Sequence, residues 1–200
     1  MSRQPFTPVA PMQPPVLWIE NFNEDLCDFR KSWPKPPYLS DEEYGKCMEA
    51  FPRVCCDIIA LEPKSRQLYL VKRTHHSAIG RWDFGGGMRR GQTPKEAAII
   101  NLKRETGIIL EKDELTFLFQ TMMYWRYRNP KPQELGEHCL VFTFCFVPTP
   151  EEIAGIKLDP TEYDIDHGVR LYDRESIKQF HESNSELLLM FYDAAFGRGS

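Results

Sequence analysis

The stretch that decides the fold runs from Trp82 to Ile108 and reads WDFGGGMRRGQTPKEAAIINLKRETGI. Its three consecutive glycines allow a ligand to approach the backbone closely and permit positive φ angles. Residues 94–106 are the clearest helix of the chain, because proline suits the first helical turn and Gly107 follows the last one. A helix start presents unpaired amides and the positive end of the helix dipole. We therefore expect a phosphate-binding loop where the glycines meet this helix.

Side-chain charge strengthens this expectation. Arg89 and Arg90 lie directly beside the glycine loop. The whole chain has a net charge of −4, which gives no global attraction to nucleic acid or to acidic membranes. Any phosphate binding must therefore come from a local cluster such as this one.

A glycine loop before a helix is a weak signal alone, but here a longer pattern surrounds it. This pattern resembles the Nudix box: it consists of the glycine pair, then GQTPKEAA at 91–98 and ETG at 105–107. Residues 73–82 also resemble the segment that precedes that box. The resemblance implies an α/β fold, namely an α/β/α sandwich with a mixed sheet between helical layers. It also implies a hydrolase acting on a nucleoside diphosphate linked to another group.

The box departs from the family at its metal-binding positions. Nudix enzymes hold a divalent metal with several glutamates on this helix, but here those positions carry Gln92, Asn101 and Arg104, and the box arginine is Ile100. Only Glu105 remains. One carboxylate is a poor cage for Mg²⁺ unless substrate phosphates and waters complete it. We expect Arg104 to face solvent, because it would oppose the charge of a metal if it pointed inward.

A reduced box also occurs in the branch that resembles GDP-mannose mannosyl hydrolase, which keeps only the last box glutamate on the helix. Residues 39–44 and 51–57 resemble the amino-terminal half of that branch, and His138 and Arg170 fit its second half. The resemblance thus covers about residues 39–196.

This resemblance implies where metal and substrate would bind. Glu105 would hold one Mg²⁺, or Mn²⁺, together with a carbonyl of Gly85 or Gly86. The nucleoside diphosphate would meet Arg73. The predicted substrate-binding residues are Arg73, Gly86, Gly87, Arg89, Arg90 and Tyr124.

Hydrolysis also needs a base, or a metal-polarised site, to activate water. The mannosyl hydrolase branch takes its base from a histidine in a late acidic loop. In the loop 159–170 the corresponding residue is His167, with Asp166 or Asp164 as a further metal ligand. A solvated acidic loop explains these residues equally well.

Residues 122–132 interleave aromatic side chains with cations. Tyr124 could stack on one nucleotide base, or on the end of an RNA strand, while an arginine holds phosphate. A strand that leads into a hairpin loop with surface cations is the alternative interpretation.

Two functions follow from these features. The first is Mg²⁺-dependent hydrolysis of a nucleoside diphosphate linked to a sugar, with Glu105 and His167 as catalytic residues. The second is a protein of the same fold that has lost hydrolysis and binds a nucleotide or an RNA 5′ end as part of a complex. Hydrolysis is the leading hypothesis, and the second function is the alternative, which the lost carboxylates, the extra Arg104 and the basic aromatic segment favour.

The chain divides into a proline-rich arm, residues 1–37, and a Nudix-like domain, residues 38–197. The arm holds half of the sixteen prolines and could join two copies as a homodimer.

No apolar run approaches the roughly 18 residues that cross a bilayer. Six cysteines without a Cys-x-x-Cys pair favour a reducing, cytoplasmic location. A mitochondrial location stays open, because Arg3 is the only charge before Glu20.

The remaining elements follow from local patterns. Ser40 caps a helix that should end near Ala50. Strands are expected at 54–61, 67–72, 116–123, 139–147 and 169–172, and further helices at 174–182 and 185–196.

Overall fold

The computed structural model describes residues 6–7, 33–182 and 184–197 of the 200-residue chain. Most of the arm, residues 1–37, lies outside this part. The homodimer expected through the arm, and the boundary at residue 37, therefore stay predictions. Within the described ranges, no helix is long and apolar enough to cross a membrane.

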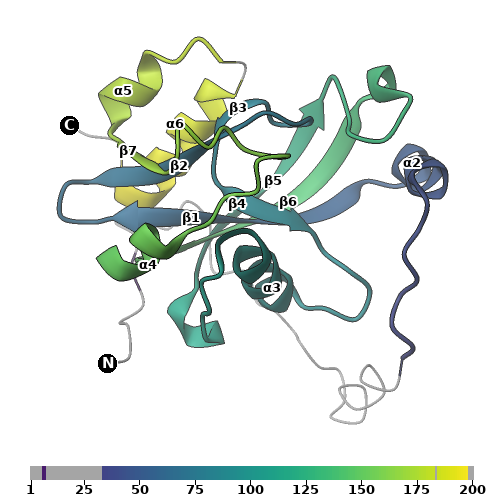
Figure 1. The fold of residues 1–200 in the computed structure, drawn as a ribbon, viewed down its shortest axis with the longest axis horizontal. Coiled ribbons are helices and arrows are strands. Elements are labelled where there is room, and N and C mark those ends of the chain that lie inside the picture. Colours follow the sequence, from purple (N-terminus) through teal and green to yellow (C-terminus); the bar gives the residue numbers. More distant parts are fainter. Residues whose placement is uncertain (1–5, 8–32, 183, 198–200) are drawn as a thin grey trace.

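A seven-stranded mixed sheet forms the centre of the domain (Figure 1). Five strands follow the order β3-β2-β1-β6-β5, while β4 also pairs with β1 and β7 with β2. The β1–β6 pairing is parallel and the other pairings are antiparallel. The strands are β1 (Arg53–Glu62), β2 (Gln67–Arg73), β3 (Gly80–Trp82), β4 (Phe84–Gly87), β5 (Thr116–Trp125), β6 (Glu137–Phe146) and β7 (Arg170–Tyr172).

Strand β1 is buried on both faces, which explains its almost continuous apolar sequence. Successive side chains of a strand point to opposite faces. Cys55 and Ile59 accordingly pack into one hydrophobic core, whereas Cys56 and Ile58 pack into the other. The sheet thus separates two cores.

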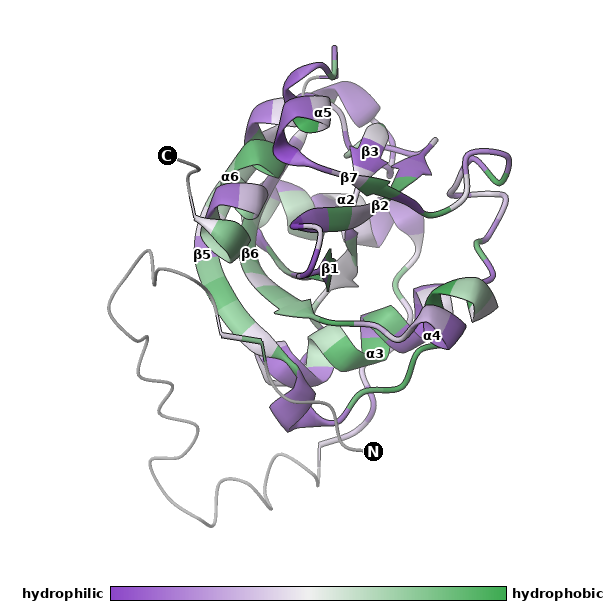
Figure 2. Ribbon diagram, turned by 90° about the vertical axis from the view of Figure 1, so that its left-hand side faces the viewer, coloured by the Kyte–Doolittle hydropathy of each residue, from purple (hydrophilic) through white to green (hydrophobic). Residues whose placement is uncertain are grey.

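Helices cover both faces of the sheet (Figure 1). Helix α3 (Pro94–Thr106) packs Leu102 into one core, and α6 (Ser185–Phe196) packs Phe191 into the other. Figure 2 shows apolar residues along β5, β6 and α3. The expected α/β/α sandwich with a mixed sheet is confirmed. The remaining helices are α2 (Asp41–Ala50), η1 (Lys112–Glu114), η2 (Gln133–Leu135), α4 (Pro150–Gly155) and α5 (Arg174–Lys178).

Several elements differ from the sequence expectations. The two strands that flank Asp83, β3 and β4, were not expected, because the first is short and the second is rich in glycine, a poor strand former. Helix α4 was also missed. The helix expected over 174–182 ends at Lys178, and Glu182 instead accepts a hydrogen bond from the Arg81 amide at 2.8 Å.

Candidate functional site

The triple glycine forms strand β4 rather than an open loop. β4 pairs with β1 so that Gly85 lies opposite Asp57. A Cβ at Gly85 would lie 2.5 Å from Asp57 Oδ1 and 2.7 Å from the Cys56 carbonyl oxygen, which is too close for any side chain. Glycine is therefore required here by close packing against β1.

Helix α3 presents its second half, and not its start, to the glycine strand. Its first turn is capped by its own side chains: Thr93 Oγ1 accepts from the Glu96 amide at 3.3 Å, and the Glu96 carboxylate accepts from the Thr93 amide at 2.8 Å. The residues nearest Gly86 are Asn101 and Arg104. The amides of Thr93 and Glu96, which belong to the helix start that we expected to bind phosphate, thus already donate to side chains, and neither residue lines the cavity described below.

Glu105 is buried, and both of its carboxylate oxygens accept hydrogen bonds. Its Oε2 accepts from the Gly85 amide at 3.0 Å and from the Tyr163 hydroxyl at 3.0 Å. Its Oε1 accepts from Arg104 Nη2 at 2.8 Å. Burial raises the pKa of this carboxyl, while the Gly85 hydrogen bond and the charge of Arg104 oppose the rise.

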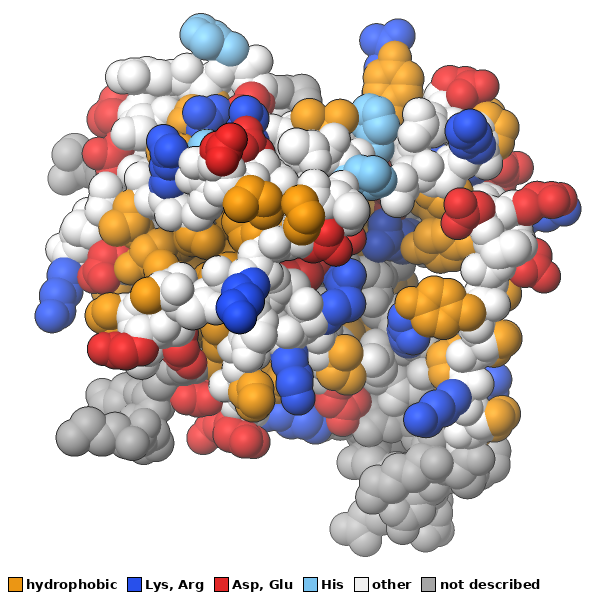
Figure 3. All heavy atoms as spheres, viewed as in Figure 1, with side chains coloured by type: hydrophobic (Ala, Val, Ile, Leu, Met, Phe, Trp, Pro, Cys, Tyr) orange, Lys and Arg blue, Asp and Glu red, His pale blue; other side chains and the backbone are white. Residues whose placement is uncertain are grey.

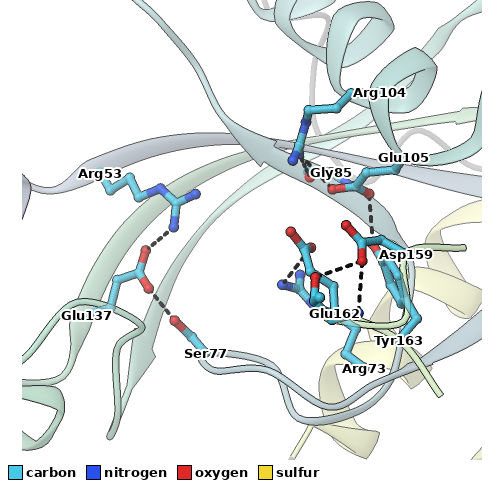
Figure 4. Close-up of polar contacts among 11 residues, drawn as sticks. Arg53, Arg73, Ser77, Gly85, Arg104, Glu105, Glu137, Asp159, Glu162 and Tyr163 are labelled. Carbon is cyan, nitrogen blue, oxygen red and sulfur yellow. Dashed lines mark hydrogen bonds and ion pairs between the residues drawn. The ribbon is translucent and has the colours of Figure 1, made fainter. Parts of the chain in front are cut away.

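Arg104 is exposed, as expected, but its guanidinium also contacts the buried Glu105, which was not expected. Its Nη2 donates both to Glu105 Oε1 and, at 3.3 Å, to the Gly85 carbonyl oxygen (Figure 4). The side chain stays 53% exposed, so the guanidinium lies between the buried carboxylate and the opening of the site. One cation thereby occupies the position between the two oxygens that were expected to hold Mg²⁺.

These groups line a cavity of about 560 Å³. Three of its arginines face acids: Arg53 Nη1 lies 2.7 Å from Glu137, Arg104 pairs with Glu105, and Arg73 lies 4.0 Å from Glu162. Figure 4 shows the Arg53–Glu137 pair apart from the group around Arg104. The arginines of the lining are Arg53, Arg73, Arg89, Arg90 and Arg104.

Arg89 and Arg90 stack on aromatic rings from the residues that precede α2. The Arg89 guanidinium carbon lies 5.1 Å from the centre of the Tyr38 ring, and that of Arg90 lies 4.4 Å from the Trp33 ring. Arg89 Nη2 also donates to the Tyr38 hydroxyl at 3.3 Å. The segment before α2 therefore forms one wall of the cavity beside the glycine strand.

Two further acids are buried near Glu105. Burial raises the pKa of Asp57 to about 7, against the opposing charge of Arg73. Burial and the neighbouring Asp57 charge raise the pKa of Asp83 well above its usual range. Within the described part of the chain, neither oxygen of Asp83 has a hydrogen-bond partner. Arg73 lowers the pKa of all three acids and so offsets part of their mutual repulsion.

The structure gathers most of the predicted site residues at this cavity. Those that line it are Arg73, Gly85, Gly86, Gly87, Arg89, Arg90 and Glu105. Tyr124, Asp166 and His167, which are all described, are not part of the lining.

Tyr124 and His167 have partners outside the cavity. The exposed ring of Tyr124 stacks on His138, with ring centres 4.5 Å apart. His167 Nε2 lies 2.8 Å from the Tyr172 hydroxyl, and its Nδ1 lies 2.8 Å from the Gly168 carbonyl oxygen. Both ring nitrogens thus take part in the packing of the segment before β7.

Comparison with known proteins identifies the family. The sequence model of the NUDIX domain matches residues 52–190, which include the sheet, the glycine strand and α3. The chain belongs to the Nudix family. No curated protein matches it closely enough to count as a relative.

Solved Nudix structures share the fold of this domain. A MutT NUDIX hydrolase from Burkholderia pseudomallei is 17% identical with a TM-score of 0.54, and the alignment covers 70% of this chain and 97% of that one. A MutT protein from Methanosarcina mazei Go1 is 15% identical with a TM-score of 0.52, covering 71% and 94%. At these identities the likeness shows the fold alone.

Nudix hydrolases generally use divalent metal ions such as Mg²⁺, so the fit of such an ion can be tested on the side chains present. The Glu105 carboxylate accepts from the Gly85 amide, and the positively charged Arg104 guanidinium donates to both this carboxylate and the Gly85 carbonyl. Among the described residues, the donor atoms of Asp57, Asp83 and Glu105 do not gather within 4.8 Å of one another. Mg²⁺ favours several anionic oxygens in one place. The residues present therefore do not fit Mg²⁺ at Glu105.

Sequence reasoning missed several residues of the cavity, among them Arg53, Asp57 and Glu137. A signal for Asp57 was available, because it is the one charged residue inside the apolar run 54–61. A charge within a buried strand is costly unless a partner compensates it, so such residues mark candidate sites. Arg53 and Glu137 stand at strand starts and carry no comparable signal.

Proposed function

We propose that this Nudix domain binds a small nucleotide-type ligand through its phosphates without a divalent ion at Glu105. On this proposal, it does not hydrolyse the ligand by the metal-dependent route. One observation carries the proposal: the Arg104 guanidinium donates to both the Glu105 carboxylate and the Gly85 carbonyl.

The chemistry of a guanidinium supports binding without hydrolysis. Arginine stays charged at all physiological pH values, and its planar fork matches phosphate oxygens. It can therefore supply the attraction for a diphosphate that a metal ion supplies in a hydrolase. A guanidinium does not lower the pKa of a bound water, however, whereas a divalent ion does. Arg104 thus replaces the binding role of the ion and not its activation of water.

The remaining cavity suits the rest of a nucleotide. Its volume of about 560 Å³ falls within the roughly 300–1,000 Å³ that is usual for small-molecule sites. Trp82 and Trp125 are part of its lining, with ring centres 5.5 Å apart and an edge-to-face arrangement, and Tyr44 and His76 line it as well. Trp82 is buried, whereas the half-buried rings of Tyr44, His76 and Trp125 can stack on a base. Arg89 and Arg90 stand beside the glycine strand for the phosphates.

The face of the molecule seen in Figure 3 favours a small ligand over extended RNA. Figure 3 shows Lys and Arg side chains interspersed with Asp and Glu on this face, without a continuous basic stripe. Binding of a nucleic-acid backbone depends on such a stripe to neutralise successive phosphates.

Mg²⁺- or Mn²⁺-dependent hydrolysis of a nucleoside diphosphate linked to a sugar is the second candidate. It is favoured by the 53% exposure of the Arg104 side chain, because movement of that side chain into solvent would release Glu105. His167 as the base and Asp166 as a further ligand stay predictions within this second candidate.

The test is calorimetric titration of the full chain with nucleoside diphosphates and nucleotide sugars, in buffer with Mg²⁺ and in buffer without a divalent ion. We expect the same affinity in both buffers and no product. Arg104→Gln should weaken binding about tenfold or more, since a hydrogen bond to a charged group contributes about 1.5–3 kcal/mol. Lys103→Gln, an exposed cation on the same helix, is the matched control and should leave the affinity unchanged.

The second candidate predicts a different pattern. Turnover that requires Mg²⁺ and disappears in Glu105→Gln would refute the proposal and establish hydrolysis. A short 5′-triphosphate RNA is included as a further ligand, and tighter binding of this RNA than of any mononucleotide would also contradict it.

A further inference from the structure

Three buried donor groups from two neighbouring strands converge on a part of the cavity wall that the nucleotide proposal does not use. They are the thiols of Cys55 and Cys139 and the carboxylate of Glu137. Their ligand atoms all lie within 4.8 Å of one another. The three residues are 6%, 3% and 7% exposed, and all three line the cavity.

The sheet brings these groups together. Glu137 and Cys139 are two residues apart on β6, so their side chains share one face. β6 runs parallel to β1, with Cys139 opposite Arg53 and Val141 opposite Cys55. Cys55 therefore lies diagonally beside Cys139 on the same face. Strands hold such an arrangement more rigidly than loops do.

Other side chains orient the carboxylate. Glu137 Oε1 accepts from Arg53 Nη1 at 2.7 Å and from Cys139 Sγ at 3.0 Å. Its Oε2 accepts from the Ser77 hydroxyl (Figure 4). Hydrogen bonds of this kind hold metal-binding carboxylates in place in known metal sites.

We propose that Cys55, Glu137 and Cys139 form a binding site for a thiophilic divalent cation such as Zn²⁺. Zinc binds thiolate sulfur at about 2.3 Å and carboxylate oxygen at about 2.0–2.2 Å, so donors this close can reach one ion with small side-chain movements. Sulfur ligands select Zn²⁺ over Mg²⁺, which prefers oxygen. Because all three residues line the cavity, water or a small ligand in the cavity would complete the four ligands of the ion.

The charges of this site balance. Binding releases one proton to solvent from each thiol, which leaves two thiolates and one carboxylate around a doubly charged cation. The remaining negative charge is offset by the Arg53 guanidinium, which already contacts Glu137. A buried ion is tolerated when its surroundings compensate it in this way.

The site is tested with Co²⁺, which replaces Zn²⁺ and reports thiolate ligands through a charge-transfer absorption. The full chain is freed of metal by a chelator under reducing conditions and then titrated with Co²⁺. We expect one equivalent to give the thiolate-to-cobalt band, and Zn²⁺ to abolish that band by displacement. Absence of the band in the wild-type chain overturns the proposal, whatever the variants do.

Variants assign the ligands. Cys55→Ser or Cys139→Ser should remove at least half of the charge-transfer absorption, and Glu137→Gln should weaken Co²⁺ binding roughly tenfold or more. Cys145→Ala is the matched control, because Cys145 is a buried cysteine of the same strand that is not part of the cavity lining, and it should leave the band unchanged. An undiminished band in folded Cys55→Ser or Cys139→Ser, checked by circular dichroism, contradicts the assignment. The titration contains no nucleotide, so its result and that of the nucleotide proposal are independent.

Discussion

Arg104 places a positive charge directly beside the one buried glutamate of α3. The resemblance to the Nudix box aligns Arg104 with a position at which we expect a glutamate, and its guanidinium contacts the neighbouring Glu105. The same resemblance aligns Asn101 with another expected glutamate, and its uncharged amide donates to the Gly87 carbonyl at 3.4 Å. On this alignment, a positive charge on α3 stands where the resemblance leads us to expect a negative one.

This reversal predicts a gain of function at the residue scale. In the double variant Asn101→Glu, Arg104→Glu, two carboxylates would join Glu105 on one face of α3, and the competing guanidinium would be gone. We expect this variant to bind Mn²⁺ at least tenfold more tightly than the wild-type chain, because hard divalent ions require several anionic oxygens. Calorimetry or the water-proton relaxation of Mn²⁺ measures the difference.

A control separates site formation from a mere change of net charge. Lys103→Glu adds negative charge on the exposed face of the same helix and should leave Mn²⁺ affinity unchanged. If the wild-type chain already binds Mn²⁺ as tightly as the double variant, and Glu105→Gln abolishes that binding, Arg104 does not replace the ion.

At the scale of elements, one buried arginine attaches α2 to the β5–β6 connection. Arg128 is 1% exposed. Its Nε donates to the carbonyls of Pro130 and Pro132, and its Nη1 donates to the Gly45 carbonyl in α2. Its Nη2 pairs with Glu49 at 2.8 Å. α2 precedes the strand that carries Asp57, so this contact also positions a wall of the cavity.

Arg128→Ala should therefore destabilise the domain by on the order of 3 kcal/mol, because it leaves buried carbonyls without donors and opens a cavity. The free energy of unfolding in urea measures this effect. Arg126→Ala, a nearby exposed arginine of the same connection, should change it by less than about 0.5 kcal/mol. A loss of similar size in both variants would show that Arg128 has no special structural role.

At the scale of the whole molecule, three buried acids lie near Arg73 within the domain. They are Asp57, Asp83 and Glu105. Because unfolding of a single domain is cooperative, the protonation of any one of these acids affects the stability of the whole domain. Asp83 is the clearest case, since it is fully buried and its pKa is raised well above 3.8 by burial and by the Asp57 charge. The folded state therefore holds the Asp83 proton more tightly than the unfolded state does.

The sign of the pH dependence follows from this difference. Above about pH 4 the unfolded chain has lost the Asp83 proton while the folded chain keeps it, so this group makes stability fall as pH rises. The slope is at most about 1.4 kcal/mol per pH unit for one proton. Asp83→Asn, which is neutral in both states, should gain on the order of 1 kcal/mol or more over the wild type at pH ~8 and little at pH ~4.

Urea unfolding at the two pH values measures this effect. Asp113→Asn, an exposed acid of η1, is the control and should show no such difference. If Asp83→Asn is less stable than the wild type at both pH values, the Asp83 carboxylate has a stabilising partner and the argument fails.

The sequence by itself determined the family and the class of fold. It also determined those cavity residues that lie in one continuous segment of the chain. Helix 94–106 was predicted with its observed bounds, because its capping residues and its C-terminal glycine are local signals. The glycine run and Glu105 were placed at one site for the same reason, since β4 and α3 are adjacent in the chain. Strand β4 was missed. Helix α4 was also missed, although its Thr149–Glu152 capping box is a local signal that predicts a helix start.

Only the tertiary structure decided which partners the charged groups have. Whether the Arg104 guanidinium contacts Glu105 depends on how closely α3 packs against the glycine strand. The adjacency of the two residues in the sequence does not determine this contact. The burial of Asp57 and Asp83 beside Arg73, and the meeting of Cys55 with Cys139, depend on strand pairings between residues far apart in the chain. Burial and partner together determine the charge state of a group, and both are set by these long-range contacts.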